Sequence, residues 1–197
     1  MGQDQSELLR EVDPELLDRC RRAERVAQGR LFQLAAQDAV RIIRGLGVRD
    51  ADLDDVVQDV FVIVFRQLPG FEGRSAFSTW FFQICVNVVR GRRRKSARDR
   101  WFRLAFGEGR EETSASPAGQ VDAARDAERL LSGLSEKHRE VLVLYEVAGL
   151  SGNEIAEATG VPLKTVWTRL HHARKKVAER ARELGAGAGA LPVREGA

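Results

Sequence analysis

The chain has 197 residues, of which 43% are hydrophobic, and its formal net charge is +3. This length suits one ordinary domain or two small ones, and the hydrophobic share is that of a globular protein. So small a charge excess does not by itself indicate a nucleic-acid partner. Cys20 and Cys85 form no CxxC pair, so the sequence indicates neither a disulfide framework nor a sulfur-rich zinc site. We expect both cysteines to be small apolar residues.

The sequence predicts neither a secretion signal nor a membrane anchor. Its first thirty residues are dense in Glu, Asp and Arg, and its most apolar run, Val56 to Phe65, is interrupted by Gln58 and Asp59. A signal peptide needs an unbroken apolar stretch, and a membrane-spanning helix needs about 20 predominantly apolar residues. We therefore expect a cytoplasmic protein with no membrane partner.

Two helical segments are expected before residue 70. From Glu15 to Leu46 the sequence favours one or two helices, with Gly45 and Gly47 close to the expected end. The next segment carries apolar residues at helical spacing up to Leu68, and Pro69 and Gly70 end it. A cluster of acids lies in its first turn, where negative charge favours the positive end of the helix dipole: Asp50, Asp52, Asp54 and Asp55.

The strongest helical periodicity follows from residue 77 to residue 89. It consists of one continuous apolar stripe that we predict to be core: Phe77, Trp80, Phe81, Ile84, Cys85, Val88 and Val89. The opposite face carries Thr79, Gln83, Asn87, Arg90 and Arg94, and the helix runs into a basic tract that reaches Arg103. This face is a surface for an anionic partner.

The helical pattern fades between residues 97 and 127, where Gly, Ser, Thr and Glu predominate. We predict a flexible linker there, between a first domain at 15–96 and a second at 128–183. Residues 1–14 form an N-terminal extension, and the Gly-Ala sequence of 184–197 predicts a disordered tail. Because no strand pattern occurs, we expect an all-α protein with two small helical domains joined by a flexible linker.

The second domain has the pattern of a helix, a tight turn and a second helix. Ser151 and Glu154 have the spacing of a capping box, and Gly160 is a natural left-handed helix end. The longer helix begins at Leu163 and buries Val166, Leu170, Ala173 and Val177. Its remaining side chains can reach a DNA major groove: Lys164, Thr165, Trp167, Thr168, Arg169, His171, His172 and Lys176. Alternatively, the two helices form a helical hairpin whose lysines and arginines are simply solvated. Trp167 is either a packing residue or a DNA contact.

Residues 52–95, with the string FEGRSAFSTW, resemble conserved region two of the extracytoplasmic-function sigma factors, and residues 134–177 resemble their region four. The resemblance covers about Leu16 to Ala181. It implies a subunit that binds core RNA polymerase, recognises and melts promoters, and directs transcription initiation. The implied partners are the clamp helices of the largest polymerase subunit, the polymerase flap, promoter DNA as duplex and non-template single strand, and an anti-sigma factor.

The resemblance also implies roles for individual residues. The helix of residues 52–68 would dock on the polymerase clamp helices through Asp55, Gln58, Asp59 and Phe61. The loop and helix that follow would open the minus-ten element and capture a flipped base, which stacking and hydrogen bonds stabilise. The expected minus-ten contacts are Phe71, Gly73, Arg74, Ser75, Thr79, Gln83, Asn87, Arg90 and Arg94. The alternative interpretations are that Phe71 anchors the core after the turn and that Asn87 is a solvated helix residue.

The minus-thirty-five element would be read by the recognition helix of the second domain. Its expected contacts are Lys164, Thr165, Trp167, Thr168, Arg169, His172 and Lys176. Relatives often have other residues at positions 164, 167 and 168, which puts the upstream promoter sequence in doubt but not the fold.

Other functions are less well supported by the residues. We find no nucleophile with a base, no phosphate-binding glycine loop and no metal-ligand cluster at meaningful spacing, so we expect no enzymatic activity, catalytic residue, metal or cofactor. His171 and His172 point about 100° apart on a helix, which disfavours a shared metal. The main alternative is a helix-turn-helix repressor or activator that binds duplex DNA without polymerase.

Overall fold

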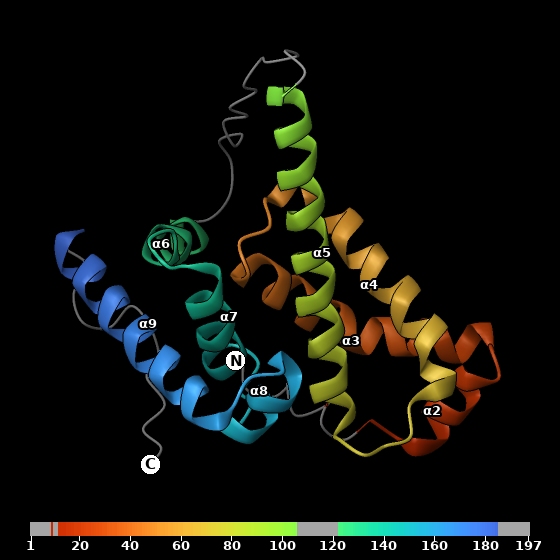
Figure 1. Cartoon of the computed structure of the whole chain (residues 1–197). Helices are drawn as coiled ribbons and strands as arrows, with labels where there is room; N and C mark the ends of the chain where they lie inside the picture. Colours follow the sequence, from red (N-terminus) through yellow and green to blue (C-terminus); the bar gives the residue numbers. More distant parts are fainter. Residues whose placement is uncertain (1–8, 10–11, 106–121, 185–197) are drawn as a thin grey trace.

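The computed structural model describes Leu9 and residues 12–105 and 122–184. Every regular element of these residues is helical, which confirms the all-α prediction (Figure 1). The first half contains α2 (Pro14–Arg21), α3 (Arg25–Gly45), α4 (Leu53–Gln67) and α5 (Phe77–Ala105), and the single turns η1 (Asp50–Asp52) and η2 (Leu68–Gly70) flank α4. The second half contains α6 (Asp122–Leu131), α7 (Glu136–Glu146), α8 (Gly152–Thr159) and α9 (Leu163–Glu183).

The helix bounds resolve one expectation that the sequence left open and differ from the sequence expectation at both ends of the predicted linker. The segment from Glu15 to Leu46 forms two helices, and the break between them holds Ala23 at a positive φ of 58°. Helix α5 continues to Ala105 and α6 begins at Asp122, so both ends of the predicted linker are helical. The middle of that linker, the predicted tail beyond residue 184 and most of the N-terminal extension lie outside the described residues, although Leu9 is fully buried.

The first half is built around α5, whose predicted apolar stripe is confirmed as core. Phe81 and Cys85 are fully buried on this stripe, and Trp80 at its margin is partly buried. Helix α4 contributes the opposing apolar face, and α3 closes the bundle. The core residues of α4 are Leu53, Val56, Val57, Val60, Phe61 and Val64.

The second half forms the predicted helix-turn-helix. The Ser151 hydroxyl accepts a hydrogen bond from the Glu154 backbone N–H at 3.3 Å, and the Glu154 carboxylate accepts one from the Ser151 N–H at 2.7 Å. Gly160 ends α8 in the left-handed region with φ 70°, a conformation that glycine adopts without a Cβ clash. The stripe Val166, Leu170, Ala173 and Val177 is buried, as predicted.

The two halves pack against each other through α8 on α5 and α7 on the end of α3 (Figure 1). Gly45 makes the second contact close, because a Cβ at this position would lie 3.0 Å from a methyl group of Val143. Val86 of α5 is fully buried although it lies outside the predicted stripe. The buried residues of both halves therefore form one continuous hydrophobic core.

Candidate nucleic-acid interface

The exposed face of α4 carries three of the four residues predicted to bind polymerase. Asp55, Gln58 and Asp59 are exposed, and Asp59 accepts hydrogen bonds from Arg92 of α5 at 2.8 and 2.5 Å. Phe61 is different, since its side chain is only 4% exposed. Its ring lies 4.6 Å from that of Phe32 and 5.8 Å from that of Phe81 (centroid distances). As a surface contact the prediction for Phe61 was wrong, because the position lies on the inward face of α4.

A pocket forms where the loop after η2 meets the start of α5. Its volume is about 290 Å³. The Phe71 ring is partly buried and lies 4.9 Å from the Trp80 ring (centroid distance), which makes an aromatic wall. Such a wall offers a π-face on which a base can stack. The residues that line the pocket are Gly70, Phe71, Glu72, Arg74, Ser75, Trp80, Gln83 and Glu157.

The structure thus brings Phe71, Arg74, Ser75 and Gln83 together, but not every predicted minus-ten residue. Arg74 is exposed and pairs with Glu72 at 2.6 Å. Gly73 has a φ of 71°, and a Cβ there would meet no atom within 4 Å, so the requirement for glycine at this turn is conformational.

Farther along α5 the predicted residues have three different environments. Thr79 is 1% exposed, and its hydroxyl donates to Glu154 of α8 at 3.2 Å. Arg90 donates two hydrogen bonds to Glu140 of α7, at 2.8 and 2.6 Å, and this contact raises the Arg90 pKa. Asn87 and Arg94 are exposed. The surface predicted for an anionic partner is therefore covered at Thr79 and partly covered at Arg90, because the second half of the chain lies against them.

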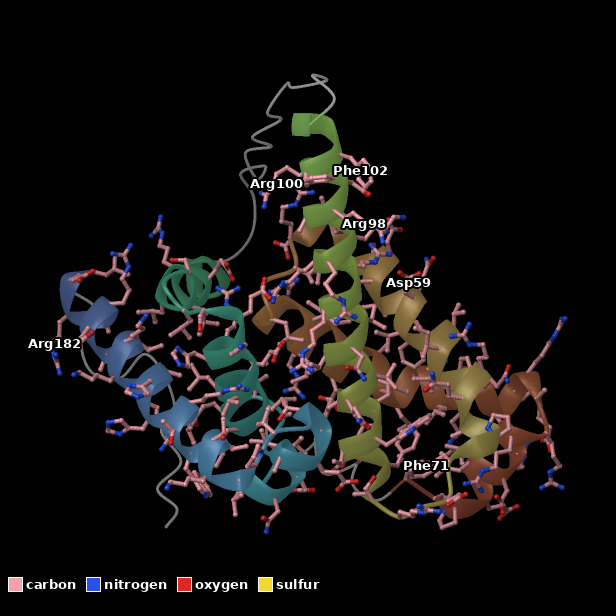
Figure 2. The ribbon with its side chains drawn as sticks, in the orientation of Figure 1. Asp59, Phe71, Arg98, Arg100, Phe102 and Arg182 are labelled. Atoms are coloured by element: carbon pink, nitrogen blue, oxygen red, sulfur yellow. The ribbon has the colours of Figure 1, made fainter. Side chains whose placement is uncertain are left out.

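The far end of α5 is basic and aromatic. In Figure 2, Arg98, Arg100 and Phe102 lie at one end of this helix and Phe71 lies near the other. The Trp101 side chain is 63% exposed, and its ring meets that of Phe102 edge-on at 5.4 Å between centroids. The sequence predicted the cations here, but it placed residues 97 onward in a linker.

Helix α9 presents a polar and basic surface on the opposite side from its buried stripe. Lys164, Thr168, His172 and Lys176 are exposed, whereas Thr165 and Arg169 are partly buried. The Thr168 hydroxyl donates to the Lys164 carbonyl at 2.9 Å. Arg169 lines a groove of about 530 Å³ between the two halves, together with Arg90, Arg93 and Arg94.

Trp167 combines the two roles that the sequence left open. Its side chain is 39% exposed, yet a Cβ at Gly152 would lie 2.6 Å from its ring. The ring also meets Tyr145 of α7 edge-on, with a centroid distance of 6.0 Å. Trp167 therefore fixes α9 against α8 while its outer edge remains accessible.

The three histidines of the chain lie near one another, where α7 packs on α9. The ring centroids of His138 and His172 are 6.0 Å apart, and those of His171 and His172 are 5.7 Å apart. Burial lowers the pKa of His138, and the nearby positive side chains of Lys176 and Arg169 lower it further. In the described part of the chain no His, Cys, Asp or Glu cluster has the arrangement of a metal site.

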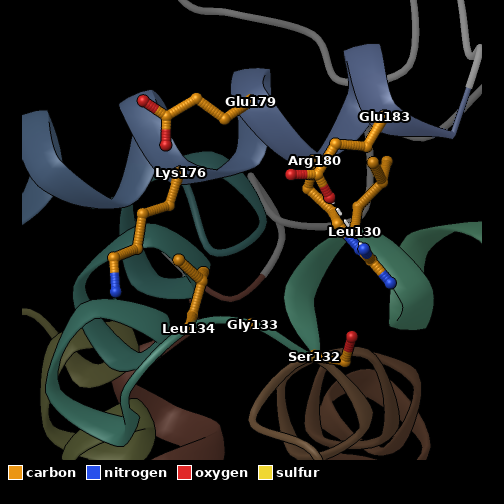
Figure 3. Close-up of a pocket in the computed structure, with 8 residues that line it drawn as sticks. All are labelled: Leu130, Ser132, Gly133, Leu134, Lys176, Glu179, Arg180 and Glu183. Carbon is orange, nitrogen blue, oxygen red and sulfur yellow. Dashed lines mark hydrogen bonds and ion pairs between the residues drawn. The ribbon is translucent and has the colours of Figure 1, made fainter.

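A third pocket, of about 320 Å³, lies between α9 and the turn that joins α6 to α7 (Figure 3). Lys176 and Arg180 reach over it from α9, and Arg180 pairs with Glu183 at 2.8 Å. Lys176, predicted to contact DNA, thus lies at the margin between this pocket and the exposed face of α9. None of the described helices is long and apolar enough to cross a lipid bilayer.

The sequence did not predict that Glu140 of α7 and Glu154 of α8 approach α5. It predicted only a packing role for Trp80. Trp80 also lines the Phe71 pocket, and its position at the edge of the apolar stripe was the available signal for this second role. Glu140 and Glu154 gave no such signal, because their partners are far away in the sequence.

Comparison with known proteins identifies the family. The model of Sigma-70 region 2 matches residues 31–99, and that of Sigma-70, region 4 matches residues 124–177. The RNA polymerase sigma factor NccH of Alcaligenes xylosoxydans xylosoxydans is 31% identical, over 84% of this chain and 92% of its own length. The ECF RNA polymerase sigma-E factor of Escherichia coli K12 is 30% identical, over 88% of this chain and 96% of its own length.

Two solved structures have the same fold. CnrH, in complex with the cytosolic domain of CnrY, matches with a TM-score of 0.64 and 27% identity, over 88% of this chain and 97% of CnrH. The sigma factor RpoE of Bartonella quintana, in complex with the anti-sigma factor NepR, also matches with a TM-score of 0.64, over 78% of this chain and 96% of RpoE. With both sigma regions in order and relatives matched along nearly their whole length, the chain belongs to the extracytoplasmic-function sigma factors of the sigma-70 family.

Proposed function

We propose that this sigma factor binds core polymerase through α4, opens the minus-ten element with the Phe71 pocket and α5, and reads the minus-thirty-five element with α9. The observation that carries the proposal is the pocket of Phe71, Trp80 and Gln83, with exposed Arg94 farther along the same helix. An aromatic wall beside an amide suits an unstacked base, and a cation suits the phosphates that follow. No catalytic step is assigned to the chain.

The docking surface on α4 is proposed to be Asp55, Gln58 and Asp59, which are exposed side by side on successive turns. We infer that they face the clamp helices of the largest polymerase subunit, while Phe61 supports them from the core. The flap would bind the second half. Because polymerase and promoter DNA are in the cytoplasm, the chain would act there.

Run-off transcription with purified core RNA polymerase tests this function. The templates are genomic fragments that include the DNA upstream of the chain's own coding sequence. We expect discrete transcripts that require the chain. Asn87→Ala should reduce them about tenfold or more, because each good base contact contributes about 1–3 kcal/mol. Gln37→Ala, which alters an exposed amide on α3, is the matched control and should leave them unchanged.

A repressor or activator would give a different result. It would bind duplex DNA with sequence specificity in the absence of polymerase, and no transcript would depend on it. Equal transcription by the parent chain and Asn87→Ala would leave the sigma function in place but remove the role proposed for Asn87.

An anti-sigma partner is proposed as well. It is supported by CnrH and the Bartonella RpoE, whose solved structures contain CnrY and an anti-sigma factor respectively. Affinity purification of the chain from resting cells should recover one additional protein that is absent after induction. Recovery of polymerase subunits alone in both states would contradict this part of the proposal.

A further inference from the structure

The guanidinium of Arg21 links α2 to the loop that forms the Phe71 pocket, where α2 packs beside η2 (Figure 1). One of its terminal N–H groups donates to the Phe71 carbonyl at 2.7 Å, and its Nε–H makes a longer hydrogen bond of 3.4 Å to the Leu68 carbonyl. A planar guanidinium presents its donors in a fixed fork, so it can hold two carbonyls in a set arrangement. Arg21 therefore fixes the backbone at the start of η2 and directly after it.

A carboxylate of the same helix orients this guanidinium. The other terminal nitrogen of Arg21 donates to Asp18, three residues earlier on α2. The Arg21 side chain is 31% exposed, so these charge-assisted hydrogen bonds are partly shielded from water, which strengthens them. Helix α2 is itself held in the core by Leu16, Leu17 and Cys20, all buried. The donors of Arg21 thus project from a firmly packed support.

The backbone that Arg21 contacts leads directly into the base pocket. The Phe71 N–H donates to the Leu68 carbonyl at 3.0 Å, so η2 is closed just before the aromatic residue. The Phe71 ring lies 4.9 Å from the Trp80 ring and 6.0 Å from the Phe77 ring (centroid distances). The direction of a phenylalanine ring follows from its backbone and two side-chain torsions. A displacement of the Phe71 carbonyl would therefore move the aromatic wall.

The rest of the loop supplies little support of its own. Glu72 and Arg74 are 63% and 86% exposed and pair with each other at 2.6 Å. A Cβ at Gly73 would meet no atom within 4 Å. Segments with few buried contacts have low local stability. Contacts from outside the loop, such as those of Arg21, therefore decide how firmly its backbone is held.

Base capture is more favourable when the pocket is already formed. Extrusion of a base from a duplex costs unstacking and unpairing free energy, which stacking on an aromatic wall recovers. If the wall has to be ordered at the same moment, part of that gain is lost as conformational entropy. A wall that is fixed beforehand retains the gain.

We propose that Arg21 is a positioning residue for promoter opening, which holds the backbone of Leu68 and Phe71 so that the pocket is formed before the minus-ten base arrives. This inference rests on the proposed function. Arg21 acts through Phe71 and does not itself touch DNA. Its loss should therefore impair the capture of an unpaired base and leave the affinity for core polymerase unchanged.

Run-off transcription from two forms of one promoter tests the proposal. Arg21→Gln should reduce transcription from the fully paired promoter about tenfold, because the lost hydrogen bonds are charge-assisted. When mismatches open the minus-ten element beforehand, the reduction should be about threefold or less, because unpairing is no longer required. Arg22→Gln is the matched control and should have no effect on either template, since Arg22 contacts Asp18 and Glu24 at the same end of α2.

Equal reductions on the two templates would overturn the proposal, because a folding defect acts on both. Parental transcription by Arg21→Gln from the paired promoter would overturn it as well. Asp18→Asn is a milder variant that keeps the Arg21 donors and removes the carboxylate that orients them. It should show the same difference between templates at a smaller size, about threefold on the paired promoter. Equal losses on both templates for this variant would also count against the proposal.

A double-variant cycle shows whether Arg21 acts through the aromatic wall. Phe71→Ala alone should reduce transcription from the paired promoter. Arg21→Gln added to Phe71→Ala should then cost less than about twofold more, because the two residues serve one contact. A further tenfold loss would assign Arg21 an independent role and overturn the proposal. An inactive parent chain, or full activity of Phe71→Ala, would instead contradict the proposed function.

Discussion

The carboxylate of Glu154 binds two neighbours at once. One oxygen accepts the N–H of Ser151 at the start of α8, and the other accepts the hydroxyl of Thr79 on α5. The residue that completes a local cap therefore also contributes to the contact between the two halves. A single side chain connects helix initiation with long-range packing.

Ser151→Ala should lower the free energy of unfolding by about 1 kcal/mol, because α8 loses the hydroxyl that accepts the Glu154 N–H. Urea denaturation followed by circular dichroism measures the change. Ser135→Ala is the control, since Ser135 begins α7 without a side-chain capping bond, and its effect should remain within about 0.5 kcal/mol. Equal losses would show that the cap of α8 contributes nothing specific.

His138 predicts a dependence of stability on pH. Burial lowers its pKa in the folded chain, so the unfolded chain takes up the proton first as the pH falls. The free energy of unfolding should therefore decrease as the pH is lowered through about 6.5. His138→Gln should reduce this decrease, measured by urea denaturation at about pH 7.5 and about pH 5.5. The same decrease in parent and variant would contradict the assignment.

At the level of the helix, glycine has opposite roles in α5 and at the end of α8. Gly160 has a φ of 70°, whereas Gly91 lies within α5, and a Cβ at either would meet no atom within 4 Å. Gly160→Ala should therefore destabilise the chain by about 1 kcal/mol through backbone strain alone. Gly91→Ala should stabilise it by about 0.5–1 kcal/mol through helix propensity. Thermal denaturation of both variants checks the opposite signs; shifts of the same sign would contradict the argument.

Local spacing explains which elements the sequence could predict. The stripe of α5, the capping box and the left-handed end of α8 all depend on residues within a few turns of one another, and all three are confirmed. Phe61 could have been placed correctly by the same spacing, because it follows Val57 by four residues and precedes Val64 by three on the buried face of α4. Local spacing could not place Thr79 and Arg90, whose carboxylate partners lie 75 and 50 residues away in the sequence, respectively.

At the level of the whole molecule, composition and pattern predicted two helical domains but not that they pack together. A linker pattern shows that two halves are connected, whereas their contact depends on complementary side chains such as Gly45 and Val143. The candidate site was accordingly predicted as a list of residues on α5 and α9. In the structure, the second half of the chain covers some of these residues, such as Thr79 and Arg90, and leaves others exposed.

The burial of Val86 between the two halves has a thermal consequence. Separation of the halves would bring this side chain and Val143 into water, and hydration of apolar surface increases heat capacity. The free energy that holds the chain closed would then curve with temperature and weaken on cooling. The strength of the contact between the two halves would therefore depend on the growth temperature of the cell.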